Sequence, residues 1–346
     1  MTPVVTLATL WFVLIAVLWT GYFFLEGFDF GVGILTPFVS KDDLDRRMCI
    51  NTIGPTWDGN EVWLLVAGGA TFAAFPVWYA TMFSGFYLAL FLMLVGLIIR
   101  GVSLEYRGKD RSARWRAWWD RALFVGSLIP ALLWGVAFTD LVHGLQIGPG
   151  YHYTGGFFGL LQPVALLGGV ASLVLFSLHG AVFLSLKTTG ELAERARAAA
   201  RLLWAPAAVL VAALVVWVGL DGRGGPVAHR VPAAIPWVLG AVAAAAVAGA
   251  GAAVLRHRDA WAFAATGTAI LTLTAAAFTS LFPRVMVSTV PTRSLTIWNA
   301  SSAHETLLVM SIVAAVFTPL VLGYQAWSYW VFRGRLSRPP VPDLHP

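Results

Sequence analysis

The chain is poor in cysteine and in charge. Among its 346 residues there is one cysteine, Cys49, which excludes an intrachain disulfide framework and a cysteine-based metal cluster. Charged residues make up only 12% of the chain, about half the usual share in a soluble domain. In contrast, 58% of the residues are hydrophobic and the mean hydropathy is +0.76. A water-soluble fold could not bury that much apolar surface, so the composition predicts an integral membrane protein.

The positive charge of the chain does not indicate a nucleic-acid partner. The net charge is +6, but the basic residues lie in short segments between hydrophobic runs, where membrane topology explains them. The sequence also has no phosphate-binding loop, no zinc-ligand spacing and no nucleophile elbow. We therefore predict neither nucleic-acid binding nor a metal site in this chain.

Hydrophobic runs long enough to cross about 30 Å of hydrocarbon recur along the whole chain. Because backbone groups in lipid need internal hydrogen-bond partners, we expect these runs to be helices. They fall at 6–28, 52–73, 78–99, 119–139, 157–186, 203–220, 235–255, 260–281 and 304–332. The sequence thus predicts an all-α integral membrane protein, a single polytopic domain over 1–346 with about nine transmembrane helices.

The basic residues between the runs predict the orientation of the chain. Nineteen of the 23 Lys and Arg residues fall in one alternate set of connecting segments, which begins with Lys41 and ends with Arg338. The opposite set has four, namely Arg223, Arg230, Arg284 and Arg293. The positive-inside rule then places the N-terminus outside and the C-terminus in the cytoplasm.

Four carboxylates lie at membrane depth, where charges are costly and indicate function. Glu26 and Asp29 come near the cytoplasmic end of the first run, and Asp58 and Glu61 begin the second. The members of each pair are three residues apart, so we expect each pair to lie along one helix face and both pairs to meet at one level. Crowded, partly desolvated carboxylates bind protons readily, as a proton path requires.

A structural role for the same acids is the alternative. In that case they form ion pairs that hold the loop between the first two runs, with three candidate partners: Arg46, Arg47 and Arg100.

Glycines and one histidine indicate how the helices pack. Gly27 and Gly31 form a small-xxx-small pair, and Gly68-Gly69 is similar, so we expect close helix approaches there. His179 lies inside the fifth run with no second intramembrane histidine beside it. A hydrogen-bonded core histidine is therefore favoured over a haem ligand.

Three segments carry an unusual order of residues. Residues 26–33 read EGFDFGVG, residues 50–64 read INTIGPTWDGNEVWL, and residues 294–302 read SLTIWNASS. Together they resemble the signatures of subunit II of bacterial cytochrome bd quinol oxidases, and the resemblance covers nearly the whole chain. The matching positions include Gly27, Gly31, Trp57, Gly59, Asn60, Trp63 and Trp298.

The resemblance implies a fold and a complex. The fold would be two four-helix bundles plus one helix, with approximate halves 1–140 and 157–282 and a C-terminal helix 304–332. The chain would be a non-haem subunit, and haem b and haem d would belong to the partner, subunit I, in a heterodimer that oxidises quinol and reduces oxygen to water. A structural quinone is also associated with this subunit type, and membrane lipid and small accessory subunits are further expected partners. High Ala and Arg use is typical of a GC-rich bacterium, which in turn favours menaquinol as the quinol.

The resemblance also implies a function for the acids. The family's acids lead cytoplasmic protons toward the oxygen-reducing haem, and by position these would be Glu26, Asp29 and Asp58, with Glu61 and Arg100 as contributors. Glu26 departs from the pattern, because the family usually has Asp there. A secondary transporter with membrane carboxylates is the competing interpretation, and a purely structural subunit is the third.

Overall fold

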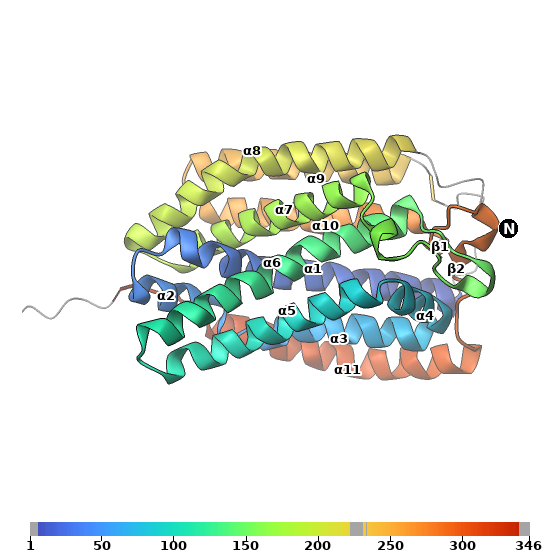
Figure 1. Ribbon diagram of the computed structural model, residues 1–346, viewed down its shortest axis with the longest axis horizontal. Helices are drawn as coiled ribbons and strands as arrows, with labels where there is room; N and C mark the ends of the chain where they lie inside the picture. The colour runs from blue at the N-terminus through green and yellow to red at the C-terminus, as the bar shows by residue number, and fades with distance from the viewer. Residues whose placement is uncertain (1–5, 222–230, 233, 339–346) are drawn as a thin grey trace, which may run out of the picture.

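The computed structural model describes residues 6–221, 231–232 and 234–338, and every structural statement below refers to these residues. The chain is almost entirely helical, as predicted (Figure 1). Its helices are α1 (Leu7–Val39), α2 (Asp43–Ile53), α3 (Trp57–Ala74), α4 (Pro76–Gly85), α5 (Tyr87–Tyr106), α6 (Ala113–His143), α7 (Pro163–Lys187), α8 (Gly190–Asp221), α9 (Ala234–Leu255), α10 (Asp259–Leu281) and α11 (His304–Val331). A small antiparallel ribbon joins β1 (Arg284–Met286) to β2 (Leu295–Thr296).

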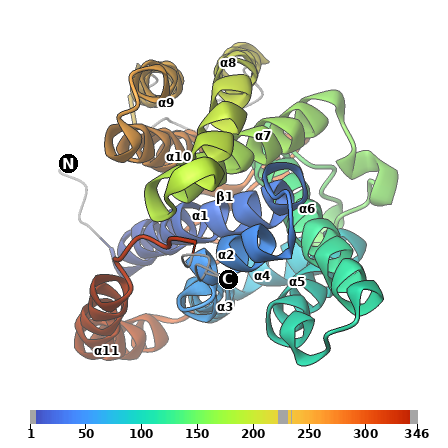
Figure 2. The ribbon, with the colours of Figure 1, turned by 90° about the vertical axis from the view of Figure 1, so that its left-hand side faces the viewer.

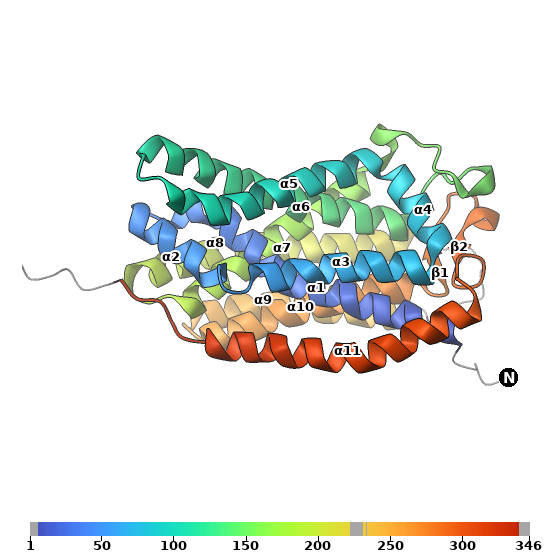
Figure 3. The same cartoon turned by 90° about the horizontal axis from the view of Figure 1, so that it is seen from below.

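The long helices run side by side along the length of the molecule (Figures 1 and 3). In the described part of the chain, eight helices are long and apolar enough to cross a membrane, namely α1 and α5 to α11. Helix α3 runs alongside them as a ninth pass, and its polar first turns, with Asp58 and Glu61, lower its hydropathy. The described chain therefore starts at one end of the bundle, here named the ribbon end, and finishes at the other, the α2 end.

Several helix boundaries differ from the predicted runs. The run 78–99 is broken at Phe86, where α4 ends and α5 begins. Helix α8 starts at Gly190, whereas the apolar run predicted a start at residue 203. The prediction missed the first turns because they are charged: Arg195 pairs with Glu191, and Arg197 pairs with Asp259 at 2.8 Å. Hydropathy alone does not detect a helix whose first turns lie outside the apolar layer.

Helix α1 lies in the middle of the bundle. In the end view it has α7 to α10 on one side and α3 to α6 on the other, while α11 lies at the edge (Figure 2). It packs against α3, α6, α7 and α10, and rings such as Trp19, Phe23 and Trp134 fill the space between these helices. This central position explains why polar side chains on α1 are cut off from water. The division into two halves remains a prediction.

Helices α1 and α7 touch through glycine. A Cβ on Gly31 would lie 2.1 Å from the carbonyl oxygen of Phe176 and 2.8 Å from Cα of Gly180, and a Cβ on Gly27 would lie 2.7 Å from the Phe176 ring. The predicted close approach at Gly27 and Gly31 is confirmed. At Gly68 and Gly69 it is wrong within this chain, because no described atom lies within 4 Å of a Cβ at either position.

Ion pairs join the helices at the α2 end. Arg107 contacts Asp120 at 2.5 Å and Asp43 at 2.7 Å, and Arg195 contacts Asp45 at 2.5 Å. These contacts connect α2 with α6 and α8. The connecting segments of the more basic set all lie at this end, as the alternation of charge requires.

A bulkier residue at the α1–α7 crossing should destabilise the bundle. We expect Gly31→Val to lower the free energy of unfolding by about 1–3 kcal/mol, because overpacking forces the helices apart. The matched control is Gly249→Val on α9, since no described atom lies within 4 Å of a Cβ there. Thermal unfolding of the purified protein, monitored by size-exclusion chromatography, gives the unfolding midpoints of both variants. Equal midpoints for the two variants would contradict the close crossing.

Candidate functional site

A fully buried arginine lies at the centre of the candidate site. Arg100 of α5 has no exposed surface, and its Nη1 donates to Glu26 Oε1 of α1. The same Nη1 lies 3.7 Å from Glu61 Oε2 of α3, and Nη2 lies 3.8 Å from Asp29 Oδ2 of α1. We call Arg100, Glu26, Asp29 and Glu61 the Arg100 cluster. It brings together three of the four predicted acids and one predicted arginine.

An amide and a phenol extend the cluster to the last helix. Asn60, also fully buried, donates through Nδ2 to Asp29 Oδ2 at 2.7 Å. Its Oδ1 accepts from Tyr329 Oη at 2.6 Å and from Gln325 Nε2 at 3.4 Å, and both of these residues lie on α11. Trp63 donates to Gln325 Oε1 at 2.8 Å. The polar contacts thus run from α5 through α1 and α3 to α11.

Tyr329 and Gln325 were not predicted from the sequence. The signal that could have found them is their four-residue spacing, which places two polar side chains on one face of the otherwise apolar helix α11.

The cluster has more negative than positive groups. Three carboxylates and one guanidinium carry a formal charge of −2 when all are ionised, and only Glu61, with 24% of its side chain exposed, reaches solvent. Glu26 Oε2, Asp29 Oδ1 and Glu61 Oε2 also lack hydrogen-bond partners in the described structure. An uncompensated charge of that size is very costly in an apolar interior, so the arrangement favours protons on the carboxyl groups.

Asp58 lies outside the cluster, contrary to the expectation that both acid pairs would meet at one level. Its side chain is exposed and interacts electrostatically with Glu105 and with Arg100, but Arg100 does not form an ion pair with it. Helices α1 and α11 contact α3 on the side of Asn60. Asp58 is two positions before Asn60 and is therefore turned by about 200° around the helix, away from that side.

The structure also shows which of the three candidate arginines pairs with the acids. Arg100 pairs with Glu26, Asp29 and Glu61. Arg46 instead lies 3.3 Å from Asp120, and Arg47 is exposed.

The other positions in the motifs lie around the cluster or far from it. Trp57 covers Gly101 of α5, where a Cβ would lie 3.1 Å from its ring, whereas Gly59 faces open space. Trp298 is half exposed and follows β2 at the ribbon end, so it belongs to a different region.

His179 is a core histidine, as expected. Its Nδ1 lies 2.7 Å from Thr266 Oγ1, its Nε2 lies 3.2 Å from the Phe24 carbonyl, and its ring stacks on Phe263. Both nitrogens are therefore occupied by protein groups, and this residue does not fit a haem ligand. Among the described residues, no three His, Cys, Asp or Glu side chains gather as a metal site would require.

Comparison with known proteins decides the family. The sequence model described as "Cytochrome bd terminal oxidase subunit II" matches residues 7–332. The chain belongs to this family. It is 43% identical to cytochrome bd ubiquinol oxidase subunit 2 of Bacillus subtilis (strain 168), over 96% of this chain and 97% of that protein. It is 40% identical to cytochrome bd-I ubiquinol oxidase subunit 2 of Escherichia coli (strain K12), over 96% of each chain.

A solved structure supports the fold. A chain in the structure of bd oxidase from Geobacillus thermodenitrificans superposes with a TM-score of 0.72, covering 94% of this chain and 98% of that one at 18% identity. The chain is thus a multi-pass membrane subunit of a bacterial terminal oxidase family. The transporter interpretation is not favoured.

Removing the guanidinium should leave its carboxylates without compensation. We expect Arg100→Gln to lower the free energy of unfolding by about 3–5 kcal/mol, because a broken buried pair leaves charge unpaired. Adding Glu26→Gln to that variant should restore part of the loss. Thermal unfolding of the purified complex measures both effects.

The control for this prediction is Arg46→Gln, which removes a partly exposed ion pair with Asp120 and should change stability by about 0–1 kcal/mol. Wild-type stability in Arg100→Gln would contradict the central position of this arginine.

Proposed function

We propose that this chain is the non-haem subunit of a quinol:oxygen oxidoreductase, and that the Arg100 cluster conducts cytoplasmic protons toward its partner. The relatives from Bacillus subtilis and Escherichia coli are named as ubiquinol oxidase subunits, which supports the reaction class. The partner would be a haem-bearing subunit I that oxidises the quinol. Its haem groups would supply oxygen reduction, the step that consumes the protons.

The orientation that we propose puts the α2 end in the cytoplasm and the ribbon end outside. The basic residues of the more basic set lie at the α2 end, and the ribbon end has Arg284 and Arg293. Arg223 and Arg230, the other two of the sparse set, lie outside the described residues. In this orientation α1 begins outside and the last described residues are cytoplasmic.

The proposed path begins at exposed acids and continues inward through partly buried ones. Asp58 and Glu105 are exposed near the α2 end, and Glu61 is one helical turn farther along α3 than Asp58. Glu61 is the only member of the Arg100 cluster with exposed side-chain surface, so it would take up the proton. Glu26 and Asp29, each with one oxygen free of hydrogen bonds, would accept it in turn. Arg100 would hold the three carboxylates within reach of one another.

The observation that supports this proposal best is the excess of carboxylates over cations in a buried cluster. An acid that served only to hold the helices would need one cation, and Arg100 could satisfy one such partner fully. Three acids around one guanidinium leave acid groups that can bind and release protons. A purely structural role is the competing proposal, and activity separates the two.

Neutral replacements should slow turnover without preventing assembly. In the purified two-subunit complex, we expect Glu61→Gln and Glu26→Gln to lower quinol-dependent oxygen consumption by at least about tenfold, because groups that transfer protons typically contribute ~10²–10⁴ in rate. Haem content per complex, from the optical spectrum, reports assembly. Asp58→Asn tests whether the exposed acid belongs to the same path.

The matched control is Asp43→Asn, since Asp43 is a carboxylate at the same end that pairs with Arg107 and Arg116. It should keep normal turnover. Full haem content with wild-type oxygen consumption in both Glu61→Gln and Glu26→Gln would eliminate the proton path. Reduced assembly with normal turnover per haem would support the structural role instead.

A further inference from the structure

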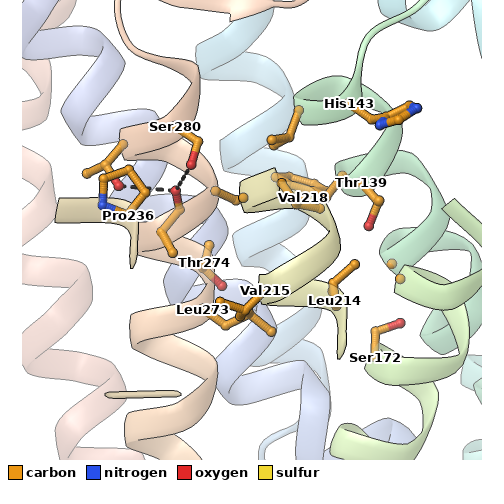
Figure 4. Close-up of a pocket in the computed structure, with 18 of the residues that line it drawn as sticks. Thr139, His143, Ser172, Leu214, Val215, Val218, Pro236, Leu273, Thr274 and Ser280 are labelled. Atoms are coloured by element: carbon orange, nitrogen blue, oxygen red, sulfur yellow. Dashed lines mark hydrogen bonds between the residues drawn. The ribbon is translucent and has the colours of Figure 1, made fainter. Parts of the chain in front are cut away.

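A cavity lies at the opposite end of the molecule from the Arg100 cluster. It has a volume of about 410 Å³ and is lined by α1 and by α6 to α10. Figure 4 shows Thr139 and His143 of α6, Val218 of α8 and Ser280 of α10 around it. Its volume is within the range of about 300–1,000 Å³ that is typical of ligand sites.

The cavity is long and mostly apolar. Both Ile270 and Ser280 of α10 line it, and ten residues of helix correspond to about 15 Å. Hydroxyl groups in its walls already have hydrogen-bond acceptors in the helix backbone. Thr274, Ser280 and Ser172 each donate to a backbone carbonyl, at 2.9 Å, 2.7 Å and 2.6 Å. The walls therefore suit a hydrocarbon chain.

One group at the ribbon end of the cavity is not satisfied. Arg284 lines the cavity from β1, three residues beyond the end of α10, and only 3% of its surface is exposed. Its Nε has no hydrogen-bond partner, and no described carboxylate lies within ion-pair distance. Burial lowers the pKa of the Arg284 guanidinium, as expected for a cation without a counter-charge.

An amphipathic anion would satisfy both features at once. A buried arginine without an acidic partner is costly, and arginine binds phosphate oxygens through its planar fork of donors. The cavity extends from Arg284 into the apolar bundle, so a headgroup there would have its chain between the helices. We infer that this cavity is a binding site for one anionic phospholipid, with its phosphate on Arg284 and an acyl chain along α10.

Competition between two lipids tests this site without any variant. The delipidated two-subunit complex is incubated with equal amounts of phosphatidylglycerol and phosphatidylethanolamine, re-isolated, and analysed by native mass spectrometry. We expect one phosphatidylglycerol to be retained in preference, and inorganic phosphate not to displace it. Equal retention of the two lipids would overturn the inference.

Two variants locate the lipid. Arg284→Gln should weaken phosphatidylglycerol binding about tenfold, which corresponds to about 1.4 kcal/mol, while Arg293→Gln at the same end should leave it unchanged. Ala277→Phe, which fills the cavity but keeps the charge, should also displace the lipid. Wild-type retention in Arg284→Gln, or retention of a neutral isoprenoid quinone in the cavity irrespective of Arg284, would contradict the assignment.

Discussion

A guanidinium that water cannot reach has to be balanced by the protein itself, and this requirement organises the α2-end half of the bundle. Arg100 of α5 contacts carboxylates of α1 and α3, and Asn60 links the cluster to α11 by accepting a hydrogen bond from Tyr329. The central position of α1, made possible by its close glycine contact with α7, is what deprives these groups of solvent. Packing and charge therefore depend on each other here.

The same arrangement explains how a structural ion-pair cluster can also handle protons. A single carboxylate on Arg100 would form a closed pair, with little reason to bind a proton near neutral pH. Three carboxylates on one guanidinium cannot all be ionised at low cost. The partly exposed Glu61 gives this excess of acid groups contact with the α2 end, while Glu26 and Asp29 have none. The geometry thus has a solvent side and an enclosed side, as a path needs.

Much of this was predictable from the sequence. The apolar runs predicted the all-α membrane fold, and the acids at membrane depth predicted a buried polar cluster with Arg100 among its candidate partners. The position of Asp58 could not be predicted, because it depends on which side of α3 the neighbouring helices cover. The roles of Asn60 and Tyr329 depend on α11 returning beside α3, a contact between residues far apart in the chain. Likewise, the unpaired Arg284 is evident only once the ribbon places it at a cavity.

The central claim is that the Arg100 cluster holds at least one protonated carboxyl group at neutral pH. Infrared spectroscopy of the purified complex measures this directly, through the carbonyl stretching band of an un-ionised carboxylic acid and its shift in deuterated water. The account predicts such a band in the wild type and its reduction in at least one of Glu26→Gln, Asp29→Asn and Glu61→Gln. A spectrum with no carboxylic acid band that any of these three replacements changes would show every acid of the cluster ionised, and would contradict the account.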